Sequence, residues 1–186
     1  MNIRFFKYND ISDADKYLLD DLLHSVWENT DTKEIHPQEM DAVSFCAMAN
    51  DIFIGYAGVV IWDICVRDKE FKMCGLSSVC THPSYRKIGI GSSLVKKATE
   101  WMMQNDQFDI GLFTCSQENI SFYENVGFWR KSPGLILKES DREGAYKSDI
   151  MGLNVFKLLI SHKAQLYASY FESEIINLNF PEGKFI

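Results

Sequence analysis

Several features that would assign this chain to another class of protein are missing from its 186 residues. No apolar run approaches the roughly 20 residues that span a bilayer, so we expect no membrane contact. The five cysteines are odd in number and none stands in a C-x-x-C pair, which predicts reduced thiols, mostly in the core, and no metal site. Met1 opens directly on a strand-like segment, so we expect no signal peptide and a cytoplasmic location.

Positive charge is also scarce. The 19 lysines and arginines are outnumbered by 26 aspartates and glutamates, which leaves a net charge of −7. Nucleic acids favour basic faces, so this balance argues against a nucleic-acid partner. A cationic small molecule such as an amine fits the same balance, because an acidic cleft would attract it.

The stretch from Leu76 to Met103 carries the strongest pattern in the chain. Residues 76–81 favour a strand, residues 86–91 read Arg-Lys-Ile-Gly-Ile-Gly, and a helix follows. The apolar face of this helix has the 3.6-residue spacing of Leu94, Val95, Ala98, Trp101 and Met102. The first amides of a helix have no intrahelical partner, and glycines let a ligand approach the backbone closely. The stretch therefore predicts an anion-binding loop with two basic residues beside it.

Two common phosphate-binding loops do not fit this glycine spacing. The P-loop pattern G-x-x-x-x-G-K-[ST] is absent, and the dinucleotide fingerprint needs a third glycine where this chain has Leu94. The remaining pattern, [QR]-x-x-G-x-[GA] between a strand and an amphipathic helix, resembles the acetyl-CoA pyrophosphate loop of the GCN5-related N-acetyltransferases (GNAT family). Residues 119–128, NISFYENVGF, resemble a second signature of that family, N-x-x-[AS]-x-x-[FL]-Y-[EK]-x-x-G-F, in its shorter form. Both motifs stand in the family's order.

The resemblance covers roughly residues 2–159 and implies the family's α/β fold. That fold is a mixed, mostly antiparallel twisted sheet of about seven strands with helices on both faces. Residues 1–159 would form the acetyltransferase domain, and residues 160–186 a C-terminal tail, packed on the domain or swapped between domains, in a monomer or homodimer. Hydrophobic patterns and turn residues place the other strands and helices. We expect strands over 2–8, 42–48, 52–66, 71–81, 109–115 and 150–159, helices after Ser12 and Ser116, and a short helix in the tail.

The resemblance also implies how acetyl-CoA would bind. Its pantetheine arm would pair with backbone groups of Val79, Cys80 and Thr81 on the fourth strand, where an amide can face the thioester oxygen. Its pyrophosphate would bind the loop and the start of the helix. The residues implied for this are Arg86, Lys87, Ile88, Gly89, Ile90, Gly91 and Ser92. Asn119 resembles the residue that bonds the pantetheine arm, and Tyr123 matches the tyrosine that protonates the departing thiolate.

The general base is where this sequence departs from the family. Many members carry a glutamate on the fourth strand, but residues 76–79 here read Leu-Ser-Ser-Val. Deprotonation of the acceptor is left to a water chain or to one of several groups. The candidates are Asp63, Glu34, Glu39, His82, which we expect to be structural, and the C-terminal carboxylate of Ile186. We also expect contacts with the acceptor from Glu34, His36, Glu39, Asp63 and Ser77.

The implied activity is direct transfer of acetyl from acetyl-CoA to a primary amine of a small, cationic acceptor. A narrower resemblance, to the aminoglycoside 2′-N-acetyltransferases, rests on Cys74-Gly75, Arg86, Tyr123, Gly127-Phe128-Trp129 and Ser132-Pro133-Gly134. Those enzymes also end in a short tail, although the acid on their fourth strand is missing here. Two alternatives remain open: transfer of a longer acyl group on the same fold, and a non-catalytic module that binds acetyl-CoA as a sensor.

Overall fold

The computed structural model describes residues 2–27 and 35–186. The chain divides into two compact units that interleave along the sequence. The first unit comprises Met1–Val60 and Leu76–Glu100, and the second comprises Ile61–Gly75 and Trp101–Ile186. Strands β3 (Ile52–Val66) and β4 (Lys69–Thr81) contribute residues to both units.

The first unit begins with an antiparallel meander. Strands β1 (Asn2–Lys7) and β2 (Val43–Ala49) pair along their length, and β2 pairs with β3. A tight turn at Asn50 and Asp51 joins β2 to β3, and both residues have positive φ, +50° and +59°. Asparagine and aspartate tolerate this conformation, which is the one that a two-residue hairpin turn needs.

The pairing of β2 with β3 contains a register shift, which affects the side chains that β3 presents to α1. Met48 pairs with Phe53 and Ala47 pairs with Gly55, so one residue of β3 is extra at this point. The bulge puts Phe53 and Tyr56 on one face, where they join the cluster that buries helix α1 (Asp13–Val26). Leu19, Leu22 and Leu23 are the buried side chains of this helix.

Helix α1 starts where the sequence places its cap. The Ser12 side chain accepts a hydrogen bond from the Asp15 amide at 3.1 Å, and Asp13 and Asp15 occupy the first turn, where negative charge is favoured. Arg4 of β1 donates two hydrogen bonds to the Asp15 carboxylate, at 2.5 and 2.7 Å. The pair ties the start of the helix to the edge strand.

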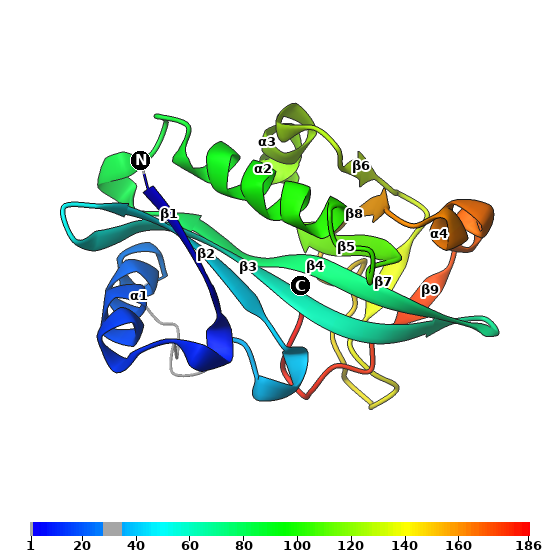
Figure 1. Ribbon diagram of the computed structural model, residues 1–186. Helices are drawn as coiled ribbons and strands as arrows, with labels where there is room; N and C mark the ends of the chain where they lie inside the picture. Colours follow the sequence, from blue (N-terminus) through cyan, green and yellow to red (C-terminus); the bar gives the residue numbers. More distant parts are fainter. Residues whose placement is uncertain (1, 28–34) are drawn as a thin grey trace. The chain divides into compact units, whose positions relative to one another are not determined.

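Helix α2 (Ile90–Met103) covers the opposite face of the first unit's strands from α1 (Figure 1). Its Ile90 and Leu94 lie against β3 at Gly55. The short helix η4 (Pro83–Tyr85) and a loop connect β4 to α2. This arrangement agrees with the predicted order of strand, loop and amphipathic helix.

The second unit is built on strand β5 (Ile110–Cys115), which pairs with β4 in parallel and with β8 (Asn154–Leu159) antiparallel. Its core is aromatic: Trp129, Phe113 and Phe156 pack together, with ring centroids 4.7 and 5.3 Å from Phe113. The remaining elements are η5 (Gln117–Asn119), α3 (Ile120–Val126), β6 (Arg130–Lys131), β7 (Ile136–Lys138), α4 (His162–Leu166), η6 (Ala168–Phe171) and β9 (Ile175–Asn177).

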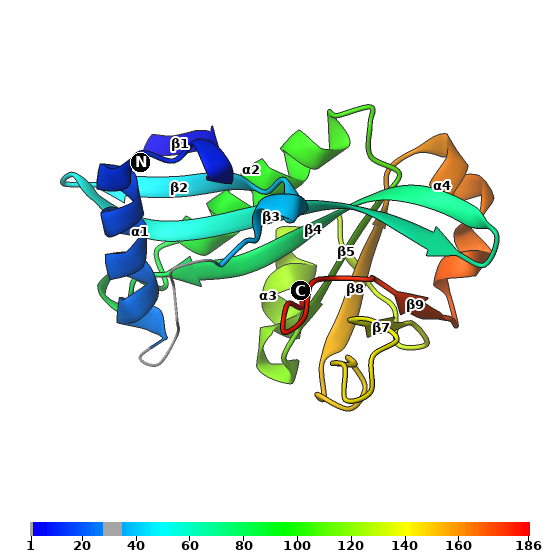
Figure 2. The same cartoon turned by 90° about the horizontal axis from the view of Figure 1, so that it is seen from below.

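Seven strands follow one another in the order β1-β2-β3-β4-β5-β8-β6, and β7 and β9 form a separate parallel pair, seen together in Figure 2. Two further short helices, η1 (Tyr8–Asp10) and η3 (Gln38–Met40), lie in the first unit. The sheet is mixed and mostly antiparallel, as expected.

Among residues 2–27 and 35–186, no helix has the length and apolar character that a bilayer crossing requires.

Some predicted details were wrong. The Ser116 side chain caps no helix, because Ser116 precedes η5 and Asn119 is the cap residue of α3. The last strand starts at Asn154 rather than Ile150, because the chain turns at 149–152, where Gly152 has φ +68°. Strand β9 lies in the tail, where we expected only a helix followed by irregular chain.

Candidate functional site

The loop before α2 is open and carries a glycine in a conformation that glycine favours. Gly89 has φ +87°, and a Cβ placed on it would meet nothing within 4 Å. Ser93 donates to the Gly89 carbonyl twice, from its amide at 3.0 Å and from its hydroxyl at 2.9 Å. These bonds close the first helical turn, so the amides of Ile90, Gly91 and Ser92 precede the hydrogen-bond ladder of the helix.

Those three amides form no hydrogen bond to another group in the part of the chain that the structure describes. The helix dipole places partial positive charge at the same end. Arg86 and Lys87 are exposed beside the loop, and Arg86 Nε donates to the Thr81 carbonyl at 3.2 Å. The loop can therefore bind a phosphate or diphosphate through backbone amides and two cations.

Strand β4 carries a backbone irregularity just before the predicted pantetheine contacts. Ser78 has φ +53°, a left-handed conformation inside a strand and unusual for any residue other than glycine. The residues that follow, Val79, Cys80 and Thr81, complete the strand. Such backbone outliers gather at functional sites, where they aim a particular group. Sequence reasoning missed Ser78, because nothing in a serine signals positive φ.

The ladder between β4 and β5 is short. It consists of Met73 with Ile110 and Cys74 with Gly111, although both strands continue past these pairs. On its other side, β5 remains paired with β8 as far as Cys115. We call the residues where this ladder ends, Cys74, Gly75, Gly111 and Leu112, the strand fork.

Tyr123, the predicted acid, belongs to the second unit and lies on α3. Its ring packs against Phe113, Phe122 and Phe156, with centroids at 4.6, 4.9 and 6.0 Å. Burial raises the pKa of the Tyr123 phenol above its ordinary value, and the nearby Cys115 adds to the effect. The phenol is therefore protonated at neutral pH.

Asn119 lies in the second unit at the start of α3 and is exposed. Its side-chain amide donates to the Ser116 hydroxyl at 3.0 Å, which keeps the turn η5 closed. The side chain does not cap α3, so its carbonyl oxygen remains available to a ligand.

The predicted acceptor residues are distributed over the two units. Ser77 is half-buried on β4, and Glu39 is exposed on η3, both in the first unit. Asp63 lies in the second unit, is 77% exposed and pairs with Lys72 at 3.0 Å. Glu34 falls outside the described residues.

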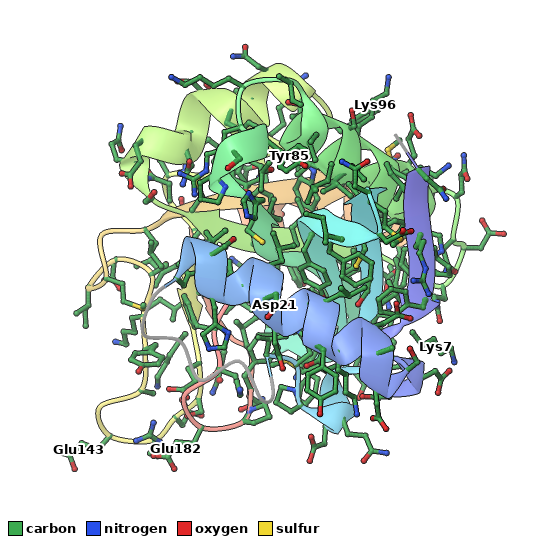
Figure 3. The ribbon with its side chains drawn as sticks, turned by 90° about the vertical axis from the view of Figure 1, so that its left-hand side faces the viewer. Lys7, Asp21, Tyr85, Lys96, Glu143 and Glu182 are labelled. Carbon is green, nitrogen blue, oxygen red and sulfur yellow. The ribbon has the colours of Figure 1, made fainter. Side chains whose placement is uncertain are left out.

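The other candidate bases have partners. His82 Nδ1 accepts a hydrogen bond from the Ser84 amide at 3.2 Å, and its ring packs on Tyr85, one of the residues labelled in Figure 3. The Ile186 main-chain oxygen accepts a hydrogen bond from the Thr114 hydroxyl. No carboxylate therefore stands out as the general base among the residues described.

His36, one of the expected acceptor contacts, is only 1% exposed and belongs instead to a buried polar network in the first unit. His36 Nε2 lies 3.0 Å from the Tyr56 hydroxyl, which lies 3.0 Å from the Ser44 hydroxyl. A Cβ on Gly58 would stand 2.5 Å from His36 Nε2, so this glycine makes room for the imidazole. The close approach of His36 therefore explains the glycine at this position of β3.

Four cysteines are buried, at positions 46, 74, 80 and 115, and Cys65 is exposed. Burial raises the pKa of Cys80 to about 12 and that of Cys115 to about 11, and it also raises the pKa of Cys46 and Cys74. These four thiols stay protonated at neutral pH and are poor nucleophiles. Among the described residues, no group of three or more His, Cys, Asp or Glu side chains could hold a metal ion.

Comparison with known proteins identifies the chain's family. No curated protein sequence matches it at a significant level. Among solved structures, Escherichia coli ElaA is similar with a TM-score of 0.60 at 14% identity, over 84% of this chain and 98% of that one. Arabidopsis thaliana NAA60, in complex with a bisubstrate analogue, gives 0.60 at 16% identity, over 86% and 99%.

A third structure, the ribosomal-protein-S18-alanine N-acetyltransferase of Escherichia coli, gives a TM-score of 0.57 at 12% identity, over 86% of this chain and 95% of that one. At these identities the likenesses establish a shared fold. Residues 11–128 match the acetyltransferase (GNAT) family, and this match spans more than half of the chain. The protein therefore belongs to the acetyltransferase (GNAT) family.

Proposed function

We propose that this acetyltransferase moves acetyl from acetyl-CoA to the primary amine of a small, cationic acceptor. One observation carries the proposal: the amides of Ile90, Gly91 and Ser92 are unoccupied at the start of α2, beside two exposed cations. A diphosphate needs such donors, and acetyl-CoA presents one. The exposed loop from Arg86 to Gly89 supports the same assignment.

The thioester would be held by β4. A pantetheine arm that leaves the loop runs along Thr81, Cys80 and Val79 and pairs with their backbone groups. The left-handed Ser78 turns the backbone immediately before Val79, so that the Val79 amide can donate to the thioester oxygen. Charge develops on this oxygen in the tetrahedral intermediate, where a fixed donor is most effective.

Proton transfers complete the reaction. The amine nitrogen attacks the thioester carbon, the new C–N bond forms and the C–S bond breaks. The CoA thiolate takes its proton from Tyr123, whose raised pKa keeps the phenol protonated beforehand. The acceptor loses its proton to water, and solvent reprotonates Tyr123.

The burial of most cysteines is consistent with direct transfer, in which no acyl-enzyme intermediate forms. An acyl-cysteine intermediate needs a thiolate, and burial raises the pKa of four of the five thiols. Cys65 is the exposed exception.

The proposed class of acceptor is inferred from the net charge of the protein, and a panel of amines tests this inference. The net charge of −7 favours a cationic acceptor over an anionic one. The solved structures include an enzyme named for a protein substrate, so the panel pairs small polyamines and alkylamines with peptides that carry a free α-amine. Faster CoA release with the small amines supports the proposal, and faster release with the peptides would replace the acceptor class by a protein N-terminus.

Substitution of Gly89 tests the loop. In Gly89→Glu, a side chain is forced to φ +87° and a negative charge enters the anion site, so we expect acetyl-CoA binding to fall below detection in a calorimetric titration. Gly152→Glu is the matched control, because Gly152 also has positive φ, +68°, and open space around it. The control should bind acetyl-CoA as the wild type does. Wild-type affinity in Gly89→Glu would refute the loop as the diphosphate site.

A further inference from the structure

Two neighbouring residues of β3, Ile54 and Gly55, contact both ends of the loop that precedes α2. At the first end, directly after the last residue of β4, the His82 amide donates a hydrogen bond to the Ile54 carbonyl at 3.0 Å. At the other end, Ile90 and Leu94 of α2 lie against Gly55. All of these residues belong to the first unit. This part of β3 therefore fixes where the loop leaves the sheet and where the helix begins.

The space at Gly55 is too small for a side chain. A Cβ placed there would lie 2.8 Å from Ile90 Cγ2, 2.8 Å from Leu94 Cδ1 and 3.3 Å from the Cys80 carbonyl oxygen. Carbon atoms pack at about 3.5–4.0 Å, so a methyl group at this position would displace the first turn of α2 from the strand. The φ angle of Gly55 lies outside the left-handed range, so close packing rather than backbone conformation accounts for the glycine.

The same position lies between the two groups that the proposed function assigns to acetyl-CoA. Cys80 belongs to the segment of β4 whose backbone would pair with the pantetheine arm. Ile90 supplies the first of the three amides that would bind the diphosphate. Because the Cys80 carbonyl and the Ile90 side chain both adjoin Gly55, the width of the strand at this residue sets the spacing between the two groups.

We propose that Gly55 is a positioning residue for acetyl-CoA, which holds the start of α2 at the distance from β4 that lets one molecule bind both. The inference rests on the proposed function. A ligand that spans two subsites binds tightly when their spacing matches its own, because its second contact then forms at a high effective concentration. A shift on the order of 1 Å at the start of α2 would lose this match while every group that touches the ligand remains.

Probes for the separate halves of acetyl-CoA test the spacing. S-acetylpantetheine reports on the strand, and ADP, which carries a diphosphate, reports on the loop. We expect the Kd of acetyl-CoA, measured by calorimetry, to rise on the order of tenfold in Gly55→Ala and roughly a hundredfold in Gly55→Val. The Kd of each fragment, measured by ligand-observed NMR, should stay within about twofold of the wild-type value, because each half of the site is intact.

A matched control and a rescue separate positioning from a structural role. Gly58→Ala adds the same methyl group to the same strand, but 2.5 Å from His36 Nε2 instead of against α2. It should lower the urea midpoint and leave the affinity for acetyl-CoA unchanged. The double variant Gly55→Ala/Leu94→Val adds one carbon atom and removes another from the same contact, so it should regain part of the lost affinity. This recovery decides the question where a fragment binds too weakly to be measured.

Ile90→Ala tests the same contact from the helix side and keeps the proposal falsifiable if the Gly55 variants do not fold. It removes the methyl group that lies against Gly55 and retains the backbone amide. The start of α2 then loses its support on β3, so acetyl-CoA should bind several-fold more weakly while both fragments bind as they do to the wild type.

The two possible failures are distinguishable. If the wild type binds neither acetyl-CoA nor its two fragments, the proposed function and this inference both fall. If the wild type binds acetyl-CoA, and the variants at Gly55 and Ile90 bind it equally well or lose the fragments to the same extent, the cofactor site stands and the positioning role of Gly55 is overturned.

Discussion

Burial is the main reason that the Tyr123 phenol stays protonated, which the proposed proton donor requires. Three aromatic rings surround it, and the absence of water around its ring raises its pKa. A raised pKa keeps the phenol protonated until a thiolate forms, and it also makes the phenol a weaker acid than an exposed tyrosine. In the proposed reaction the phenol gives its proton to the CoA thiolate and recovers one from solvent.

Tyr123→Phe should therefore lower kcat by about 10²- to 10⁴-fold, the usual worth of a positioned general acid. The ring contacts survive the change, so the dissociation constant of acetyl-CoA should stay within about twofold. Tyr17→Phe, on the exposed face of α1, is the control and should leave both quantities unchanged. Turnover by Tyr123→Phe equal to the wild type at every pH would remove the phenol from the mechanism.

Single residues also show what the sequence could not reveal. The cap at Ser12 was predictable, because its partner is three residues away and local geometry decides the contact. The left-handed Ser78 and the His36–Tyr56 hydrogen bond were not, because each depends on strands that are distant in sequence. The role of Asn119 was inferred from a motif, and its contact with Ser116 explains why η5 replaces the first turn of the expected helix.

At the start of β5, the side chain of Asp109 joins this strand to β4 and to α4. Asp109 accepts hydrogen bonds from the Lys72 amide on β4 at 2.9 Å and from the Ser161 hydroxyl at the cap of α4 at 2.7 Å, and it pairs with Lys163 at 3.4 Å. Burial alone would raise the pKa of Asp109, but these hydrogen bonds and the charge of Lys163 outweigh it and lower the pKa.

Asp109→Asn should lower the free energy of unfolding at pH 7 by about 1–3 kcal/mol, because it removes a charged acceptor and leaves its donors poorly matched. A carboxylate with a depressed pKa stabilises the fold above its ordinary value of about 3.9, and this contribution is lost as pH falls through the depressed value. Urea titrations should therefore show a difference between wild type and variant that is constant near neutrality and shrinks below about pH 4. Asp141→Asn is the control, because this carboxylate is exposed and pairs with Lys138 at the surface. A pH-independent difference for Asp109→Asn would contradict the argument.

The strands were predicted best where their pattern was long. Strand β3 has the ends that the sequence indicated, Ile52 and Val66, because apolar residues and flanking turns bound it clearly. Strand β4 begins at Lys69, two residues before the predicted Phe71, since the hairpin turn uses Arg67 at φ +57° and is tighter than the charged run suggested. Strand β9 was missed, because its three residues gain their hydrogen bonds only from β7, far earlier in the chain.

The two compact units are interleaved along the sequence. The chain passes between the two units at residues 60/61, 75/76 and 100/101, so neither unit forms from one continuous segment. Contacts of high sequence separation slow folding, because the loops that they close cost entropy before the contacts form. The predicted division into residues 1–159 and a tail follows the family resemblance. The tail, with its strand β9, belongs to the second unit.

The distribution of thiols over the whole molecule gives the last prediction, which separates direct transfer from an acyl-cysteine route. Of the five cysteines, Cys65 alone is exposed, so N-ethylmaleimide should modify one thiol in the native protein and all five after unfolding. Mass spectrometry counts the modified thiols in the native and in the unfolded protein. Native enzyme carrying one label at Cys65 should keep its rate of CoA release, and initial rates against both substrates should give intersecting lines, as a ternary complex requires. Parallel lines from the enzyme labelled at Cys65, or an acetyl group trapped on one of the other four cysteines, would instead mean that a buried thiol ionises in spite of a pKa raised to about 11 at Cys115 and about 12 at Cys80.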